Sequence, residues 1–186
     1  MLIFTKMKKD LFQEIEIPEG IDAEIQENKI IIKGPEGENQ KEFNITNLKF
    51  EKKDNKIIIG NKKSTKTEKK LMNTIAAHIK NMIKGVQEKF EYKLKICFSH
   101  FPMTVEIKGK ETIIKNFLGE KIPRKSSILE NVDVKIDKEI ITVTSSNKES
   151  AGQTAANFES ATRITNKDRR VFQDGIFITN KAGRAM

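Results

Sequence analysis

The strongest constraint on the fold of this chain is an internal repeat. Residues 18–38 align with residues 100–120 without a gap, and seven of the 21 aligned pairs are identical. A repeat of this kind is typical of one structural unit that occurs twice in a chain. The sequence therefore predicts two similar modules, residues 1–85 and residues 86–186.

Each module is expected to be a β-sheet with one α-helix packed on one face. Ile21–Gln26 alternates apolar and polar residues, which is typical of a half-buried strand. A Ser/Thr-x-x-Glu capping box at Thr65–Glu68 predicts the start of one helix, which should end near Gly85, and the box at Ser146–Glu149 predicts the start of the other. Further strands are predicted at residues 29–33, 42–50, 56–60, 92–98, 104–108, 112–117, 132–136 and 140–144. This order of elements indicates the α+β class, with two tandem similar domains that each hold an antiparallel or mixed sheet.

The charge of the chain limits its possible partners. The formal net charge is +9 and 33% of the residues are charged, so the surface should attract polyanions. No apolar run approaches the roughly 20 residues that span a bilayer. The apolar stretch at residues 1–4 is too short for the core of a signal peptide. We therefore expect a cytoplasmic protein without a membrane partner.

The residues that carry most enzyme chemistry are scarce. Cys97 is the only cysteine, so no internal disulfide can form, and we interpret it as a small buried side chain in a strand. With His78 and His100 it cannot complete a four-ligand zinc site. His78 is expected to be a partly exposed helix residue, and His100 to have a structural or RNA-adjacent role. The sequence thus predicts no enzymatic activity, no metal, no cofactor and no small-molecule substrate.

Three clusters of Lys and Arg are the best functional signal. One precedes the first predicted helix, where backbone N–H groups also favour phosphate, although a solvated loop is the alternative. A second surrounds Pro123 in a predicted loop, and a third lies after the second helix, in a segment whose last residues, 180–186, are expected to be disordered without a partner. Arg suits such a site because it makes paired hydrogen bonds to phosphate and stacks on bases. The candidate RNA-binding residues are Lys62, Lys63, Lys121, Arg124, Lys125, Arg163, Lys167, Arg169, Arg170, Lys181 and Arg184.

Several linked motifs give the chain a family resemblance. It resembles the universal ribosomal protein L6 family of the large subunit, in its archaeal and eukaryotic form, from about Ile15 to Lys181. The motifs that carry the resemblance are Glu16–Ile21, Lys29–Lys33, Gly34–Gly37, Phe90–Lys95, His100–Pro102, Asn116–Lys121, Ser150–Ala156 and Asp168–Phe177.

The resemblance implies a structural constituent of the large ribosomal subunit. Such a protein has two similar α+β domains and binds large-subunit rRNA, chiefly through the second domain. It lies near the sarcin–ricin loop and the base of the stalk, with neighbouring ribosomal proteins and translation factors close by. It has no cofactor and no enzymatic activity. The expected contacts are the loop after Asn116–Glu120 and the segment after the second helix.

Two other functions remain open at this point. The same lysines could serve a basic adaptor or assembly factor that binds acidic protein surfaces without RNA selectivity. An RNA-processing enzyme is disfavoured, because the sequence offers no convergent set of His, Asp and Glu residues.

Overall fold

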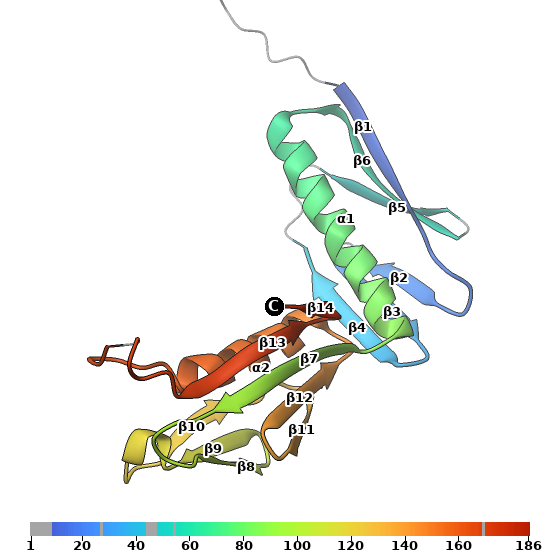
Figure 1. The fold of residues 1–186 in the computed structure, drawn as a ribbon. Coiled ribbons are helices and arrows are strands. Elements are labelled where there is room, and N and C mark those ends of the chain that lie inside the picture. Colours follow the sequence, from blue (N-terminus) through green and yellow to red (C-terminus); the bar gives the residue numbers. More distant parts are fainter. Residues whose placement is uncertain (1–8, 27, 44–47, 54, 169) are drawn as a thin grey trace, which may run out of the picture. The chain divides into compact units, whose positions relative to one another are not determined.

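The computed structural model describes residues 9–26, 28–43, 48–53, 55–168 and 170–186 (Figure 1). The chain divides into two compact units, Met1–Glu88 and Lys89–Met186, which we call unit 1 and unit 2. Each has its own apolar core.

In unit 1, the described strands form two three-stranded antiparallel sheets that share one helix, α1. One sheet has the order β1-β6-β5 and the other the order β2-β3-β4, and α1 contacts β3, β6, β1 and β4 (Figure 1). The elements are β1 (Lys9–Glu16), β2 (Asp22–Gln26), β3 (Lys29–Gly34), β4 (Gly37–Glu42), β5 (Lys49–Lys53), β6 (Lys56–Ser64) and α1 (Lys66–Gln87).

Helix α1 closes the core of unit 1. Its start is the predicted capping box, in which the side chain of Glu68 accepts from the backbone N–H of Thr65. Its apolar stripe includes Ile79, which has no exposed surface, and Val86, also fully buried. Gly34 at the end of β3 lies so close to this last turn that a Cβ there would overlap Val86 Cγ1. A glycine is therefore required where the strand passes under the helix.

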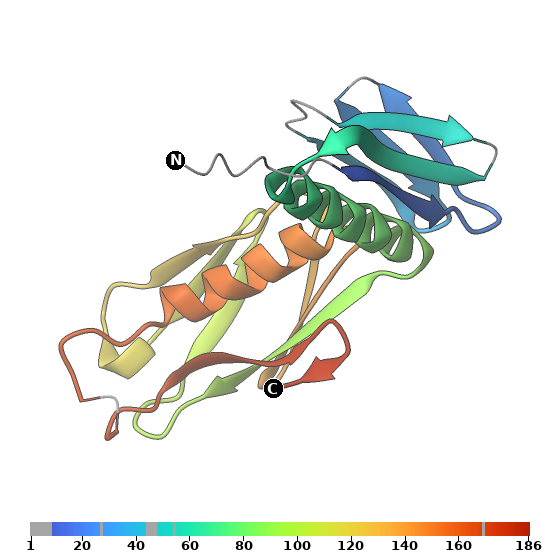
Figure 2. The same ribbon diagram turned by 90° about the horizontal axis from the view of Figure 1, so that it is seen from above.

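In unit 2, the described strands form a five-stranded and a three-stranded antiparallel sheet. The larger sheet has the order β11-β12-β7-β13-β14, and the smaller has the order β10-β9-β8. Helix α2 lies against β13, β12 and β7 on one side and β10 on the other (Figure 2). The elements are β7 (Phe90–Cys97), β8 (Thr104–Lys108), β9 (Glu111–Lys115), a 3₁₀ turn (Phe117–Gly119), β10 (Arg124–Ser127), β11 (Asp133–Asp137), β12 (Ile140–Ser145), α2 (Lys148–Ala161), β13 (Gly175–Lys181) and β14 (Arg184–Ala185).

Helix α2 lies close to its sheet because its inner face is small. Ala151 and Ala155 are fully buried, and a Cβ added to Gly152 would lie 3.2 Å from the Tyr92 hydroxyl oxygen. The N-cap is Asn147, whose Oδ1 accepts from the backbone N–H groups of the next turn. The predicted cap, Ser146, was thus wrong by one residue.

The predicted α+β class with two similar units is confirmed. Each unit divides its strands between two sheets, where the sequence suggested one. A single strand was expected at residues 42–50. This was wrong where the structure describes the chain, because β4 ends at Glu42 and β5 begins only at Lys49. Residues 44–47 lie outside the described residues. Strand β10 was expected to be a loop. Residues 180–186 were expected to be disordered. They instead contain the end of β13 and the whole of β14, and these two strands pair as a hairpin.

Neither described helix is long and apolar enough to cross a membrane.

Candidate nucleic-acid interface

Two segments of unit 2 meet at one end of the domain and form what we call the basic tip, which consists of residues 116–125, 161–168 and 170–174. Arg124, at the start of β10, joins them. Its Nη1 donates to the carbonyl oxygens of Ala161, at 3.0 Å, and Arg163, at 3.2 Å. These contacts hold the end of α2 against the loop that precedes β10.

The rest of the Arg124 side chain is also engaged inside the tip. Its Nε and Nη2 donate to the carboxylate of Glu120 at 2.8 and 2.6 Å, and the guanidinium lies 4.2 Å from the centre of the Phe117 ring. The hydrogen bond from Arg124 lowers the pKa of Glu120 despite some burial, and the charges of Arg124 and Lys167 add to this effect. Arg124 is therefore mainly a structural latch, with limited capacity to bind phosphate.

The backbone of the first loop is tightly wound. Asn116 and Leu118 have φ values of 58° and 49°, a left-handed conformation that is uncommon for residues other than glycine. Asn116 Nδ2 donates to the carbonyl oxygen of Pro102 at 2.9 Å, and Phe117 fills the core with 1% of its surface exposed. Lys121, which follows this turn, is exposed.

The second loop is held by a buried carboxylate. Asp174 is 2% exposed and accepts from the backbone N–H and hydroxyl of Ser99, at 3.0 and 2.8 Å, and from the backbone N–H of His100 at 3.3 Å. Burial is the largest single influence and raises its pKa, but the hydrogen bonds from Ser99 and His100 together outweigh it, so the pKa of Asp174 is lowered. The network ties the end of β7 to the segment before β13.

Two aromatic rings, those of His100 and Phe172, connect this network to the cation of Lys167. The His100 ring stacks on Phe172 with centroids 5.0 Å apart, and the Nζ of Lys167 lies 4.8 Å from the centre of the Phe172 ring. His100 was expected to have a structural or RNA-adjacent role, and it has a structural one here: it stacks on Phe172, which in turn contacts the candidate RNA-binding residue Lys167. This cation–π contact holds the ammonium group of the exposed Lys167 against the Phe172 ring.

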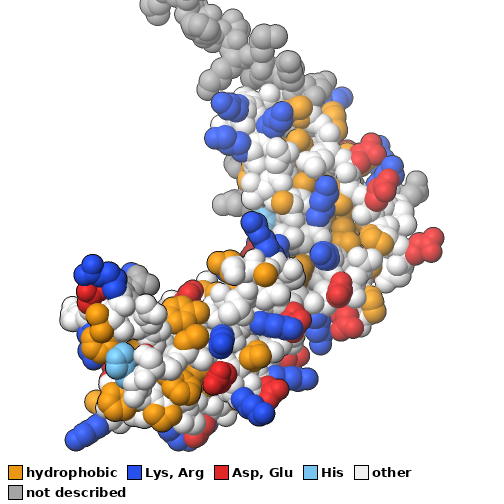
Figure 3. Space-filling model, in the orientation of Figure 1, with side chains coloured by type: hydrophobic (Ala, Val, Ile, Leu, Met, Phe, Trp, Pro, Cys, Tyr) orange, Lys and Arg blue, Asp and Glu red, His pale blue; other side chains and the backbone are white. Residues whose placement is uncertain are grey.

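The remaining cations of the tip are exposed. Arg163 is solvent-exposed, and Arg170 forms an ion pair with Asp168 at 2.8 Å. Lys125, on β10, pairs with Glu111 at 3.2 Å. Exposed pairs of this kind are weak, so a phosphate can replace the carboxylate. Blue side chains gather with orange ones at this end of unit 2 in Figure 3.

Four candidate residues lie outside the tip, and a fifth, Arg169, is not among the described residues. Lys181 and Arg184 pair across the β13–β14 hairpin, and the register of β13 places Lys181 opposite Tyr92, away from the tip by roughly 20 Å of strand. Lys62 is exposed near the end of β6 in unit 1. The side chain of Lys63 and the whole of Arg169 lie outside the described residues.

Sequence reasoning missed the exposed apolar residues around the tip. Phe98 and Phe101 are 42% and 48% exposed, while Ile122 and Val171 are 81% and 61% exposed. Phe98 continues the alternation of β7 and was expected to be half-buried. A Phe on each side of Ser99–His100, just after a strand, was the available signal.

A groove of about 840 Å³ runs along the flank of the tip. Arg163, Arg170 and Phe172 line one part of it, and Phe177 and Cys97 another. Cys97 is partly exposed, so its interpretation as a buried side chain was wrong. The groove offers aromatic and guanidinium surfaces together, which suits a nucleotide base.

The described residues contain no group of three or more His, Cys, Asp or Glu side chains placed to share a metal ion. Fold and surface together define the class of this chain: a duplicated α+β protein that offers a binding surface. The family model for ribosomal protein L6 matches the chain twice, at residues 17–89 and at residues 101–175. The chain therefore belongs to the ribosomal protein L6 family, and it is a structural protein of the ribosome and not an enzyme.

The curated relatives agree with this over almost their whole length. The chain is 43% identical over 169 residues to the large ribosomal subunit protein uL6 of Methanobrevibacter smithii, a match that covers 91% of this chain and 95% of the relative. It is 43% identical over 176 residues to the protein of the same name from Methanosarcina mazei, covering 95% of this chain and all of the relative. Identity to uL6 of Methanococcus vannielii is 41% over 174 residues, covering 94% of this chain and 96% of the relative. The resemblance stated from the motifs is thereby confirmed.

Proposed function

We propose that this protein binds large-subunit rRNA through the basic tip of unit 2 and thereby supports translation. Its relatives are named as proteins of the large ribosomal subunit, which places this chain in the same particle, in the cytoplasm. From the family resemblance we infer that the contact lies near the sarcin–ricin loop and the base of the stalk, with translation factors and neighbouring ribosomal proteins as the other partners.

The observation that carries the proposal is the latch formed by Arg124. By binding the carbonyl groups of Ala161 and Arg163, it brings two segments that are distant in sequence to one end of the unit. The exposed Lys121, Arg163 and Lys167 lie in the two segments that this contact joins. Cations fixed in this way release counterions from RNA without losing much side-chain freedom on binding. Recognition should follow the shape of folded RNA, because the A-form major groove hides the base edges.

The other candidate cations would make secondary contacts. Lys181 and Arg184 are exposed on the hairpin and Lys62 is exposed on unit 1, so each is free to meet a second RNA segment. Lys63 and Arg169 remain candidates by sequence alone.

The test is a filter-binding titration at several salt concentrations. The probe is a transcribed rRNA fragment that carries the sarcin–ricin loop and its adjoining helices. The variant Arg163→Ala/Lys167→Ala/Arg170→Ala removes three cations of the tip. The matched control removes three exposed lysines from strands of the same unit, Lys95, Lys108 and Lys135.

The tip variant should bind at least tenfold more weakly. The negative slope of log K against log salt should become shallower by about 2, because fewer counterions are released on binding. The control should lose much less affinity, because its lysines lie outside the tip. Equal losses in both variants would show that only the overall charge matters. If an acidic polypeptide such as polyglutamate competes as well as the rRNA fragment does, the basic adaptor becomes the better description.

A further inference from the structure

The two units differ at one edge of their equivalent sheets. In unit 2, β7 lies inside its sheet, with β12 on one side and β13 on the other. In unit 1, the equivalent order is β5-β6-β1, and β1 has a partner on one side only among the described residues. Unit 1 cannot fill this place with a strand after its helix, because α1 ends at Gln87 and β7 begins at Phe90.

Two matching hydrogen bonds align β1 with β7. The N–H of Ile17 donates to the carbonyl oxygen of Asn55 at 2.8 Å, and the N–H of Ile96 donates to that of Glu139 at 2.7 Å. Each acceptor directly precedes the equivalent strand, β6 or β12. Ile17 therefore corresponds to Ile96.

This alignment shows which groups of β1 point to the open edge. In an antiparallel strand, alternate residues turn their N–H and C=O groups to the same side. Ile17 faces β6, so Ile15 does as well, and Glu14 and Glu16 face away from it. The residues that correspond to these glutamates in unit 2, Lys93 and Lys95, pair with β13.

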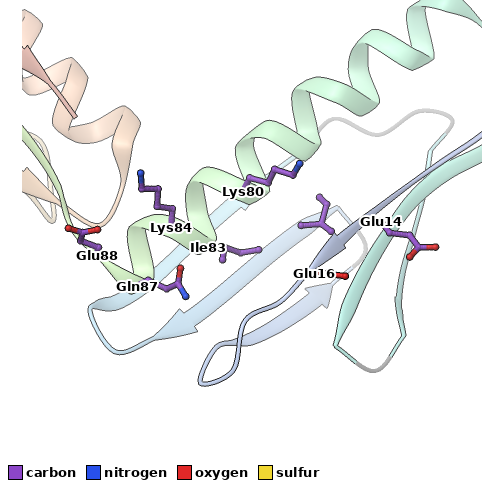
Figure 4. Close-up of a pocket in the computed structure, with 8 residues that line it drawn as sticks. Glu14, Glu16, Lys80, Ile83, Lys84, Gln87 and Glu88 are labelled. Atoms are coloured by element: carbon purple, nitrogen blue, oxygen red, sulfur yellow. The ribbon is translucent and has the colours of Figure 1, made fainter. Parts of the chain in front are cut away.

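A groove lies along this open edge. It has a volume of about 640 Å³ and is bounded by β1 and by the last turns of α1 (Figure 4). The buried side chains of Ile15 and Ile83 line it, and Lys80 and Lys84 stand on the helix. The space next to β1 is thus apolar on its inner side and polar at its rim.

The outward face of β1 adds a chemical preference. Phe12 is 57% exposed, and Glu14 and Glu16 share the single lysine Lys56, at 3.3 and 3.6 Å. A strand laid beside them would place its own outward side chains next to two carboxylates and a phenyl ring. Lys and Arg are favoured at those positions, because cross-strand pairs of opposite charge stabilise a sheet.

We propose that an extended segment of a second protein adds to β1 as an antiparallel strand, in the place that β13 occupies in unit 2. This segment would alternate β-branched apolar residues, which face Ile15 and Ile83, with Lys or Arg, which face Glu14 and Glu16. The main-chain hydrogen bonds supply the affinity and the alternation supplies the specificity. The partner is therefore a protein and not RNA, and the site is separate from the basic tip.

The probe is a peptide with the sequence of Gly175–Lys181 in which lysine replaces Phe177 and Thr179, so that it alternates isoleucine with lysine as proposed, and a lysine is added at each end for solubility. It is added to the ¹⁵N-labelled full chain, and amide exchange is followed by NMR. The backbone amides of Glu14 and Glu16 should exchange at least tenfold more slowly with saturating peptide. A control peptide with proline at the position of Phe177, which pairs with Lys95 in unit 2, lacks the N–H that would pair with β1 and should have no effect.

Two variants of the protein test the same contact. Glu14→Pro removes one N–H from the open edge, while Glu14→Thr removes the same carboxylate and keeps the N–H. Glu14→Pro should weaken peptide binding at least tenfold relative to Glu14→Thr, with both circular dichroism spectra unchanged.

Equal binding by the two variants would overturn the proposal, as would unchanged exchange at Glu14 and Glu16 with millimolar peptide. Protection of these amides in the free protein that rises with protein concentration would also overturn it, in favour of pairing between two copies of the chain. If Glu14→Pro does not fold, the two peptides still decide the question on the unaltered protein.

Discussion

Replacing Asp174 with Ala should destabilise unit 2 without disturbing unit 1. The carboxylate is almost completely buried and serves the backbone N–H groups of Ser99 and His100 and the hydroxyl of Ser99. Alanine would leave these donors without an acceptor. The loop that holds Ser99 and His100 is itself exposed, so water can replace part of what is lost.

The magnitude follows from the number of donors. A donor that loses its partner costs about 1 to 3 kcal/mol, and the lower value applies where water has access. The three backbone and hydroxyl donors at the lower value give a loss of about 3 kcal/mol for Asp174→Ala, and the loss of the contact with the His100 ring, whose Nδ1 lies 3.2 Å from Oδ1, adds to it. Asp174→Asn keeps one acceptor oxygen and the shape of the side chain, so it should cost about half as much.

The chain carries its own reporter for this measurement. It has no tryptophan and one tyrosine, Tyr92, which is buried in unit 2. Tyrosine fluorescence during urea denaturation therefore follows unit 2 alone. With a slope of about 1 kcal/mol per molar urea, the midpoint for Asp174→Ala should fall by roughly 2 to 3 M.

Acid gives an independent check of the same contact. Because the pKa of Asp174 is lower in the folded state than in the unfolded state, its stabilisation is fully present above the unfolded pKa. It is lost as pH falls through the folded pKa, which means below about pH 4. The difference in unfolding free energy between the wild type and Asp174→Asn should therefore shrink in that range.

The matched control is Asp168→Ala, in the same loop. Asp168 is exposed and pairs only with the exposed Arg170 among the contacts described, so the midpoint should stay unchanged. A midpoint shift of less than about 0.5 M for Asp174→Ala, or equal shifts for both variants, would refute the reasoning that one buried carboxylate holds the second loop of the tip.

Three further changes test the packing. Thr112→Val removes a fully buried hydroxyl that has no hydrogen-bond partner among the described residues, so unit 2 should gain about 1 kcal/mol in the same urea assay; a loss would indicate a hidden partner. Gly34→Ala should destabilise unit 1 by about 1 to 3 kcal/mol, because the new Cβ overlaps Val86; circular dichroism measures this, and an unchanged unfolding curve would contradict the close approach. Asn147→Ala should cost unit 2 about 1 kcal/mol in the urea assay, and an unchanged midpoint would contradict its role as the N-cap of α2.

Much of the architecture could be predicted from the sequence because local signals agree with the fold. The capping box at Thr65 marks the start of α1, and the alternation of Tyr92, Leu94 and Ile96 marks β7. The repeat also predicted two units of the same class. These signals depend on side chains that face a core, which leave a period in the sequence.

The strands that were missed lack such a period. Strand β4 has the sequence GENQKE, and Asn39 is its only buried residue. Strand β10 is RKSS, and only Ser126 is buried beneath α2. Polar strands are stabilised by backbone pairing to a neighbour, and the sequence of one strand does not reveal its neighbour.

The candidate site also has a part that the sequence could predict and a part that it could not. The clusters of Lys and Arg could be found by composition, and they include the exposed cations of the tip. The role of Arg124 could not be found, because its partners are the carbonyl groups of residues 37 and 39 positions away. Likewise, nothing local in the sequence indicates that Asp174 reaches back to Ser99.

The central place of β13 in its sheet has a consequence for synthesis of the chain. All strands of unit 1 precede α1, so this unit can fold soon after residue 87 has left the site of synthesis. Strand β7 ends at Cys97 but must wait for Gly175, so the nascent second unit keeps an open edge while most of its length is made. The same delay applies to Asp174, so the loops of the basic tip should become ordered only late in synthesis.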